Sequence, residues 1–268
     1  MGDGLSLATS QARPCDTGHQ HGEMMMIEVR KAGMAGCLHD AGVTLRCHFA
    51  FRTCGDAGRV HWGRLRVVNV ATMAPGATFA LGAEENTEIL TWTGAQELYF
   101  SGPGFVSSTL PPGSVQALGA GDGVNGPAWR AGAAGGGFIQ FWFLPDDEGG
   151  SPVVDVRTAC PMREDGGFRI LASGFPEDDP EAESDITDGA PLTIRASARL
   201  LDATVRAGDS AVYATVPGRA LYLLVVSGAV AVDGRALDAG DAAAVRACTG
   251  IKLTASTAAY VMLADIGE

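Results

Sequence analysis

The sequence predicts an all-β protein built from two β-barrels that are joined by an acidic segment. Short segments rich in Val, Ile, Leu and aromatic residues recur along the chain and are bounded by Gly, Pro or Asp. Gly is abundant, at 37 of 268 residues, and long helical periods are scarce. An acidic stretch that contains proline divides the apolar segments into two groups. Strands at this spacing are typical of sandwiches and jelly-roll barrels, so two barrels and a linker form the simplest arrangement.

The elements follow this plan in chain order. Residues 1–25 are polar and without periodicity, which predicts a disordered extension. A first barrel is expected over residues 26–145, an acidic linker over 146–190 and a second barrel over 191–268. The Asp233-Gly234 pair, placed directly after a strand, predicts a tight hairpin turn. The clearest predicted strands cover residues 65–70, 87–93, 96–100, 137–144, 220–226, 229–232 and 258–264.

Composition excludes several classes of protein. A net charge of -12 argues against a nucleic-acid partner, because phosphate binding needs a basic patch. No apolar run approaches the length needed to cross a bilayer, and the N-terminus lacks the pattern of a secretion signal. The six cysteines show no CxxC pair, so neither a disulfide framework nor a zinc finger is indicated. A cytoplasmic location is expected, and 17 Arg against 2 Lys indicates a GC-rich bacterial genome.

Several stretches, in one order and at similar spacing from Met26 to the C-terminus, resemble the pirin family of bicupins. They are Met26-Ile-Glu-Val-Arg-Lys-Ala, Gly63-Arg-Leu-Arg-Val-Val-Asn, Glu88-Ile-Leu-Thr-Trp, Leu110-Pro-Pro-Gly-Ser-Val-Gln, Ile139-Gln-Phe-Trp-Phe-Leu-Pro and Val225-Val-Ser-Gly-Ala-Val-Ala-Val-Asp-Gly. The resemblance implies two stacked jelly-roll barrels with an iron-like metal in the N-terminal one. Some members of the family have dioxygenase activity on flavonols such as quercetin, so the resemblance also suggests this activity.

The chain departs from the family at the metal ligands. The resemblance implies a His-Pro-His turn and a later His-x-Glu pair, but the six corresponding positions hold Gly82, Ala83, Glu84, Gly126, Pro127 and Ala128. Of the four ligand positions, only Glu84 offers a donor, whereas non-haem iron needs about three protein ligands. We therefore expect no metal and no cofactor. One alternative is a site rebuilt from Glu84 with His48 or His61.

The candidate site lies in the N-terminal barrel, where loss of the ligands is expected to leave space for a small molecule. Glu84 is the first candidate for acid or base chemistry, because partial burial raises the pKa of a carboxyl group. Glu88 and His48 are the other candidate catalytic residues. The side chains expected to bind a substrate, from the segments that frame this cavity in the family, are Trp92, Gln116, Asn125, Trp129, Gln140 and Trp142.

The sequence leaves two main hypotheses open, and whether the chain is an enzyme is part of that choice. The first is a metal-independent enzyme that cyclises, isomerises or eliminates on an aromatic or polyketide-like substrate. The second is a non-catalytic sensing or regulatory protein, with a bound ligand or with thiols among Cys37, Cys47 and Cys54. A metal dioxygenase requires ligands that the sequence lacks. An open cavity with an inward Glu84 favours the first hypothesis, and an aromatic-filled barrel favours the second. The C-terminal barrel, which has no histidine from Ile194 onward, is expected to be scaffold.

Overall fold

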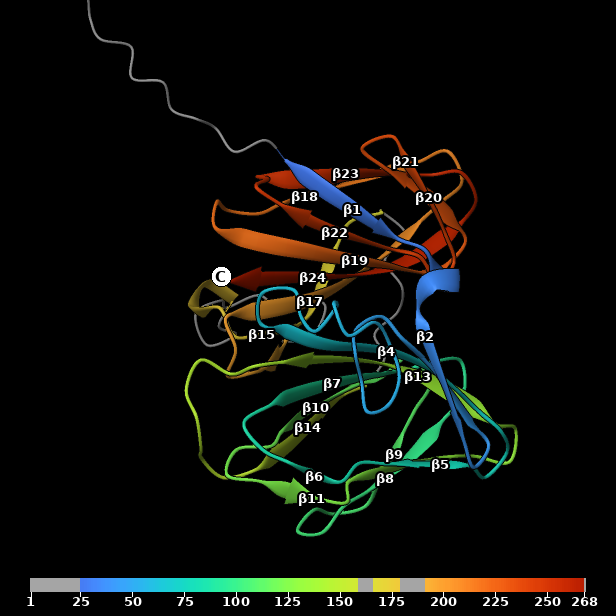
Figure 1. The fold of residues 1–268 in the computed structure, drawn as a ribbon, viewed down its shortest axis with the longest axis vertical. Coiled ribbons are helices and arrows are strands. Elements are labelled where there is room, and N and C mark those ends of the chain that lie inside the picture. The colour runs from blue at the N-terminus through green and yellow to red at the C-terminus, as the bar shows by residue number, and fades with distance from the viewer. Residues whose placement is uncertain (1–24, 159–165, 179–190, 268) are drawn as a thin grey trace, which may run out of the picture.

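The computed structural model describes residues 25–158, 166–178 and 191–267, which form two β lobes stacked one on the other (Figure 1). Residues 1–24 of the predicted extension lie outside the described residues, as do residues 159–165 and 179–190 of the predicted linker. Strands dominate the described ranges. Their helices are single 3₁₀ turns, η1 (Ala32–Met34) and η2 (Pro176–Asp178), far shorter than a bilayer-crossing helix. The prediction of an all-β fold of two jelly-roll barrels is confirmed.

The N-terminal barrel packs a seven-stranded sheet against two smaller sheets (Figure 1). The strand order in the large sheet is β14-β10-β7-β13-β4-β3-β2, and the smaller sheets are β5-β12-β8-β9 and β11-β6. The large sheet consists of β2 (Gly36–Asp40), β3 (Val43–Cys47), β4 (Leu65–Met73), β7 (Glu88–Thr93), β10 (Val115–Gly119), β13 (Gly136–Phe143) and β14 (Val153–Arg157). The smaller sheets consist of β5 (Thr78–Ala80), β6 (Ala83–Glu84), β8 (Leu98–Ser101), β9 (Ser108–Leu110), β11 (Val124–Asn125) and β12 (Ala128–Ala131).

The C-terminal barrel repeats this design with a large sheet ordered β1-β22-β19-β24-β17-β15-β16 and a small sheet ordered β18-β23-β20-β21. The large sheet consists of β1 (Met26–Arg30), β15 (Arg169–Ser173), β16 (Leu192–Thr193), β17 (Ala198–Val205), β19 (Arg219–Ser227), β22 (Ala242–Arg246) and β24 (Ala259–Gly267). The small sheet consists of β18 (Ser210–Ala214), β20 (Ala229–Val232), β21 (Arg235–Asp238) and β23 (Gly250–Ala255). Each of the seven strands expected from the sequence corresponds to a strand of these sheets. The predicted hairpin turn joins β20 to β21, with φ of 44° at Asp233 and 81° at Gly234.

The domain boundaries differ from the expected ones in two places. Strand β1, expected to open the first barrel, pairs instead with β22 of the second, where Ile27 lies opposite Val245. In β1 the apolar residues Ile27 and Val29 alternate with polar residues. This pattern lets β1 pair with the edge of the alanine-rich β22 that β19 leaves open. The expected linker, 146–190, also contains β14, which pairs with β10 of the first barrel, and β15, which pairs with β17 of the second. Long-range pairing thus extends both sheets into the acidic segment.

Three clusters of buried apolar side chains hold the molecule together. One fills the N-terminal barrel, one fills the C-terminal barrel, and the third lies between the two large sheets. We call this third region the seam. On β13, for example, Phe141 faces the seam while Trp142 faces the interior of its own barrel. Because neighbouring strand residues point to opposite faces, each large sheet carries one apolar face for its barrel and one for the seam.

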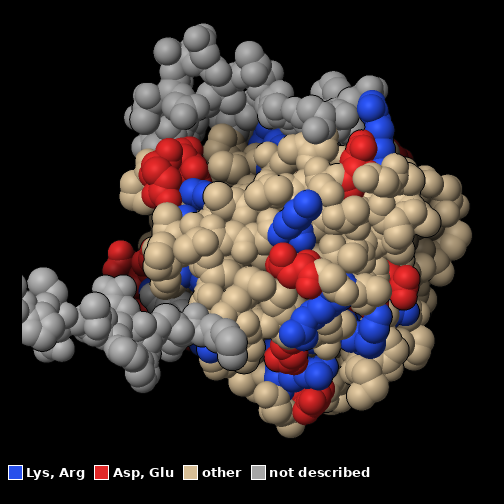
Figure 2. Space-filling view, turned by 90° about the horizontal axis from the view of Figure 1, so that it is seen from above, with Lys and Arg blue, Asp and Glu red and all other residues tan. Residues whose placement is uncertain are grey.

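The surface opposite the N-terminal barrel shows mixed charge. Figure 2, viewed from above, shows Lys and Arg side chains interspersed with Asp and Glu on this face, and no continuous basic field among the residues drawn in colour. Phosphate backbones are bound by clustered positive charge. Positive and negative side chains therefore lie close together among the coloured residues of this face.

Candidate functional site

The two segments that resemble the metal-binding turns lie side by side. Strand β6 pairs with β11, so that Glu84 lies opposite Val124 and Ala83 opposite Asn125. Beyond this pair, the Gly126 amide donates a hydrogen bond of 3.1 Å to the Gly82 carbonyl. The four positions that correspond to ligands in the family therefore belong to one local structure, although they are more than 40 residues apart in the sequence.

The side chains at these positions do not fit a metal ion. Gly82, Gly126 and Ala128 have no donor atom, and a Cβ built on either glycine would meet nothing within 4 Å. At Gly126 the backbone φ of +70° also lies in the region that favours glycine over histidine. In the described part of the chain, no three His, Cys, Asp or Glu side chains are grouped closely enough to hold a metal. One carboxylate, that of Glu84, is too few for the iron site that the fold implies.

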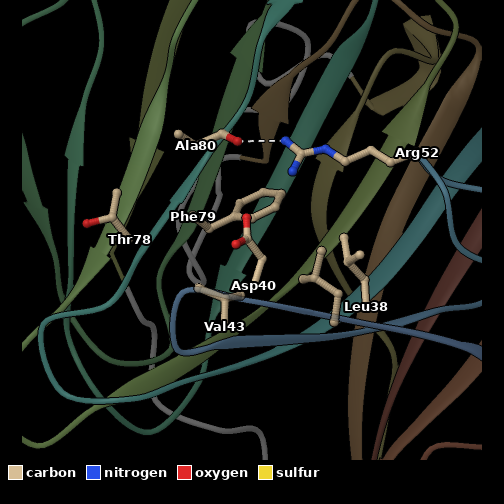
Figure 3. Close-up of a pocket in the computed structure, with 8 residues that line it drawn as sticks. Leu38, Asp40, Val43, Arg52, Thr78, Phe79 and Ala80 are labelled. Atoms are coloured by element: carbon tan, nitrogen blue, oxygen red, sulfur yellow. Dashed lines mark hydrogen bonds between the residues drawn. The ribbon is translucent and has the colours of Figure 1, made fainter.

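Glu84 lies instead beside a cationic side chain. Burial raises the pKa of the Glu84 carboxyl group above its ordinary value, and the positive charge of Arg52 opposes this rise. The Arg52 Nη2 donates a 2.6 Å hydrogen bond to the carbonyl of Ala80, four residues before Glu84 (Figure 3). Its guanidinium carbon lies 5.4 Å from the centre of the Phe51 ring and 5.3 Å from that of Phe79. Two aromatic rings and a carbonyl therefore position this guanidinium.

A cavity of about 120 Å³ opens beside Arg52. Figure 3 shows the guanidinium extending to the Ala80 carbonyl beside the Phe79 ring, with Asp40 and Val43 across the cavity. Such a volume admits roughly one aromatic ring, by comparison with a cavity of about 150 Å³ that binds benzene. The lining residues are Leu38, Asp40, Val43, Leu45, Arg52, Thr78, Phe79 and Ala80. Arg52 was not expected from the sequence, because nothing in the turn around it indicates that its side chain reaches β5.

Four of the expected substrate-binding residues are buried inside the N-terminal barrel. Trp129 Nε1 donates a 2.7 Å hydrogen bond to Gln116 Oε1, and Trp142 Nε1 donates a 3.2 Å bond to Gln140 Oε1. Gln140 in turn donates to the Thr91 hydroxyl at 3.1 Å. These side chains bond to one another, so the structure gives them a packing role. Asn125 is exposed on β11, outside this interior.

Aromatic rings occupy the space around these amides. The centre of the Trp129 ring lies 5.5 Å from that of Phe100 and 6.3 Å from that of Phe138, and Phe79 lies 5.2 Å from Phe138. Trp129 and Phe138 are almost wholly inaccessible to solvent. The interior expected to be open is thus filled, and space for a ligand is found at the rim beside Arg52.

The structure places three expected site residues at the seam, which corrects the sequence-based site. Glu88 and Trp92 alternate along β7 with Ile89 and Thr91, so they face away from the barrel interior. The Glu88 Oε1 accepts a 3.1 Å hydrogen bond from Arg195 Nε, and burial raises the pKa of this carboxyl group against that opposing charge. The Trp92 ring lies 5.3 Å from the ring of Tyr260. Both side chains join the two barrels and do not face a ligand.

His48 is the third of these residues. Its Nδ1 lies 3.0 Å from the Tyr222 hydroxyl at the seam, and its Nε2 has no hydrogen-bond partner among the described residues. Burial lowers the pKa of His48 to about 4, and the nearby charges of Arg30 and Arg46 act in the same direction. Because this imidazole is enclosed and contacts Tyr222 of the second barrel, His48 takes no part in the candidate site.

Asn69 is a further buried polar residue that sequence reasoning missed. It is fully buried on β4 opposite Gln140, and neither its Oδ1 nor its Nδ2 has a partner among the described residues. Its position within the apolar run Val67-Val-Asn-Val was the available signal, because a polar residue there is expected to be enclosed.

Comparison with known proteins agrees with this architecture. A profile described as the quercetinase C-terminal cupin domain matches residues 183–266. A Pseudomonas aeruginosa protein, provisionally named a quercetin 2,3-dioxygenase, is 32% identical over 241 residues, which cover 90% of this chain and 100% of that protein. A pirin-like protein of Caulobacter vibrioides is 31% identical over 218 residues, covering 81% of this chain and 90% of its own.

Solved structures show the same fold. The crystal structure of YhhW from Escherichia coli superposes with a TM-score of 0.78 at 20% identity, covering 90% of this chain and 97% of that one. A second structure, of the bacterial pirin YhhW in complex with nickel(II), gives a TM-score of 0.77 at 20% identity and covers 90% and 99%. With relatives above 30% identity along nearly their whole length, this chain belongs to the pirin family of bicupin proteins.

Proposed function

We propose that the chain binds a small aromatic or polyketide-like molecule at the rim of the N-terminal barrel, and that Glu84 exchanges a proton with it without a metal. The observation that carries this proposal is the position of Arg52, which lines a cavity of about 120 Å³ and whose charge acts on Glu84, the one donor left at the turn where metal ligands are missing. A carboxyl group with a raised pKa is suited to proton transfer near neutral pH.

The two side chains have complementary roles in this proposal. A planar ring of the ligand packs in the cavity against Phe79, with an oxygen directed at the Arg52 guanidinium. Ionised Glu84 takes a proton from a hydroxyl or an acidic carbon of the ligand, and Arg52 stabilises the negative charge that develops on the neighbouring oxygen. Return of the proton to a different atom completes a cyclisation or an isomerisation, and loss of a leaving group completes an elimination.

The dioxygenase activity named for several relatives is not part of this proposal. That activity needs a metal site, and the chain has one donor, Glu84, at the four corresponding positions. The side chains present supply acid, base and cation, which are the components of proton transfer.

The test uses protein treated with a chelator and a panel of hydroxylated aromatic ketones, with quercetin as the first probe. Saturable binding is expected without metal, measured by calorimetry, together with slow turnover of at least one compound. Glu84→Gln is expected to abolish turnover, and Arg52→Gln to weaken binding about tenfold, the loss of one charge-assisted hydrogen bond. The matched control is Glu85→Gln, the exposed neighbour, which leaves both unchanged. Oxygen consumption restored by stoichiometric iron or nickel would contradict the proposal, and so would full turnover in Glu84→Gln.

A second candidate, a non-catalytic sensing role, is favoured by two observations. Aromatic rings pack against one another in the barrel interior, as the second hypothesis expects. The Cys47 and Cys54 thiols are also neighbours, since Cys54 contributes to the raised pKa of Cys47. Burial and the proximity of Cys54 raise the pKa of Cys47, so its thiolate is scarce.

Mass spectrometry after treatment with hydrogen peroxide tests this second role. Oxidation of the two thiols to a disulfide removes two hydrogen atoms from the protein and reduces the peroxide to water. A Cys47–Cys54 cross-link in the tryptic map, absent from Cys54→Ser, supports sensing. Reaction at Cys37 alone, the exposed thiol, excludes it.

A further inference from the structure

A groove of about 350 Å³ lies on the outer face of the small sheet of the N-terminal barrel. It is formed by strands β5, β12, β8 and β9 and shares only Thr78 with the cavity beside Arg52. The lining residues are Thr78, Tyr99, Phe100, Ser101, Ser107, Ser108, Thr109, Ala128 and Arg130. Hydroxyl groups and one guanidinium thus dominate the polar lining.

The strand register explains the shape of this groove. Thr78, Arg130, Tyr99 and Thr109 are direct neighbours across the four strands and form one row. The next row on the same face carries the small residues Ala80, Ala128 and Ser101. Large side chains beside small ones leave a hollow between the rows. The alternate residues Phe79, Trp129 and Phe100 point into the core, so the floor of the groove is rigid.

Arg130 is a cation without a partner in this groove. Its guanidinium carbon lies 4.6 Å from the centre of the Tyr99 ring, which orients the planar group. Across the described ranges, no carboxylate or other acceptor pairs with Arg130, although the chain carries a net charge of -12. The nearest acidic contact of the row, Glu97, accepts a hydrogen bond from the Tyr99 hydroxyl instead.

The hydroxyl groups around this cation are also available. Thr78, Ser101, Ser107 and Thr109 make no side-chain hydrogen bonds to residues in the described part of the chain. A hydroxyl donates one hydrogen bond and accepts two, and a guanidinium presents two parallel donors that match two oxygens of a phosphate. Together they form a set of donors that surrounds an oxyanion.

We propose that this groove binds a tetrahedral oxyanion, phosphate or sulfate, carried on a small hydroxyl-bearing molecule. The Arg130 fork binds two oxygens of the anion, the serine and threonine hydroxyls bind the remaining oxygens, and the rest of the groove holds the polyol. A neutral sugar fits less well, because it needs a free aromatic face for stacking and Arg130 covers Tyr99. This site is independent of the function proposed for Glu84.

The test is a calorimetric titration of the full chain with glucose 6-phosphate, with ionic strength held constant. Saturable binding is expected, and inorganic phosphate and sulfate are expected to compete for it. Arg130→Gln is expected to weaken binding at least tenfold, since a hydrogen bond to a charged group is lost. Ala128→Leu fills the floor of the groove without changing charge and is expected to weaken binding to a similar extent.

Lys252→Gln is the matched control, because Lys252 is an exposed cation on the small sheet of the other barrel. It removes the same charge and is expected to change the affinity less than twofold. An absence of saturable binding would overturn the proposal, and so would glucose that binds as tightly as glucose 6-phosphate. Equal affinities of wild type and Arg130→Gln would also overturn it. So would equal losses of affinity in Arg130→Gln and Lys252→Gln. Circular dichroism checks that each variant is folded, and Arg130→Lys, which keeps the charge but loses the fork, is expected to fall between wild type and Arg130→Gln.

Discussion

The two barrels have the same architecture but treat buried polar groups differently. The N-terminal barrel encloses aromatic rings and amides, and Asn69 and the Gln116 Nε2 lack partners among the described residues. The C-terminal barrel encloses mainly Ala, Val, Leu and Ile. Its most deeply buried carboxylate, that of Asp265, accepts hydrogen bonds from Tyr213 at 2.6 Å and from Thr215 at 3.0 Å, and lies 3.4 Å from Arg219.

This difference separates scaffold from site. A buried polar group without a partner costs free energy, so a stable fold retains few of them unless they serve another purpose. The buried carboxylates of the C-terminal barrel are paired with cations or hydroxyl groups, as expected of a scaffold. Within the described residues, the N-terminal barrel leaves the Asn69 amide and the Gln116 Nε2 without partners, and it carries the Arg52 cavity on its rim and the Arg130 groove on its outer face.

The largest effect is expected from breaking the paired charge of the C-terminal barrel. Asp265→Asn removes the negative charge that faces Arg199 and Arg219, whose side chains are only 11% and 13% exposed. Breaking a buried pair by removing one partner costs about 3 kcal/mol or more in the free energy of unfolding. Urea denaturation measures this loss. Asp209→Asn, an exposed turn residue of the same barrel, serves as the control and is expected to change stability by less than about 0.5 kcal/mol. Equal effects of the two variants would remove the distinction between scaffold and surface.

The second prediction concerns His48 at the seam. Because its pKa falls from 6.5 to about 4 on folding, the unfolded chain binds a proton first as the pH drops. This contribution to stability is therefore complete above pH 6.5 and is lost between pH 6.5 and about 4, by about 3 kcal/mol. Unfolding measured across this range is expected to show a shallower pH dependence in His48→Asn than in wild type. The exposed His61 gives the control, His61→Gln, whose pH profile should follow wild type. If the free energy of unfolding depended on pH in the same way in all three proteins, burial at the seam would not disfavour protonated His48.

A smaller effect of opposite sign is expected inside the N-terminal barrel. Asn69→Leu replaces an enclosed, unpartnered amide by an apolar group of similar size and is expected to stabilise the fold by about 1 kcal/mol. Its neighbour across the strands provides the contrast, because Gln140→Leu leaves the Trp142 and Thr91 groups without a partner and is expected to cost about 1–3 kcal/mol. Thermal unfolding compares the two. A destabilised Asn69→Leu would show that this amide has a partner such as water.

The smallest effect is expected at the rim. The pKa of Glu84 is raised in the fold, so its contribution to stability is present below its ordinary value of 4.5 and is lost as the pH rises through the higher folded value. Glu84→Gln is therefore expected to be more stable than wild type at pH 7, by a few tenths of a kcal/mol after solvent screening, and indistinguishable at pH 3.5. Glu85→Gln gives the reference profile, expected to be flat relative to wild type. A difference for Glu84→Gln that is constant with pH would show that burial does not perturb this carboxyl group.

Local sequence predicted seven of the strands and part of the site. Alternating apolar residues and turn signals such as Asp233-Gly234 located strands on both sides of the acidic segment, because both signals act over a few residues. The absence of metal-binding side chains at Gly82 and Gly126 was also evident from the sequence, since it depends on residue type alone. The resemblance placed Gln116, Trp129, Gln140 and Trp142 on segments that frame the cavity and predicted that they bind a substrate, whereas in the structure they bond within the N-terminal barrel.

By itself, the sequence determined that the chain folds as two β-barrels without the ligands of a metal site. Only the tertiary structure decided that β1 belongs to the second barrel, that Glu88, Trp92 and His48 lie at the seam, and that Arg52 and Arg130 border open space. The physical reason is that a strand has two faces, and the face that becomes a barrel interior is set by pairing and packing with residues far away in the chain.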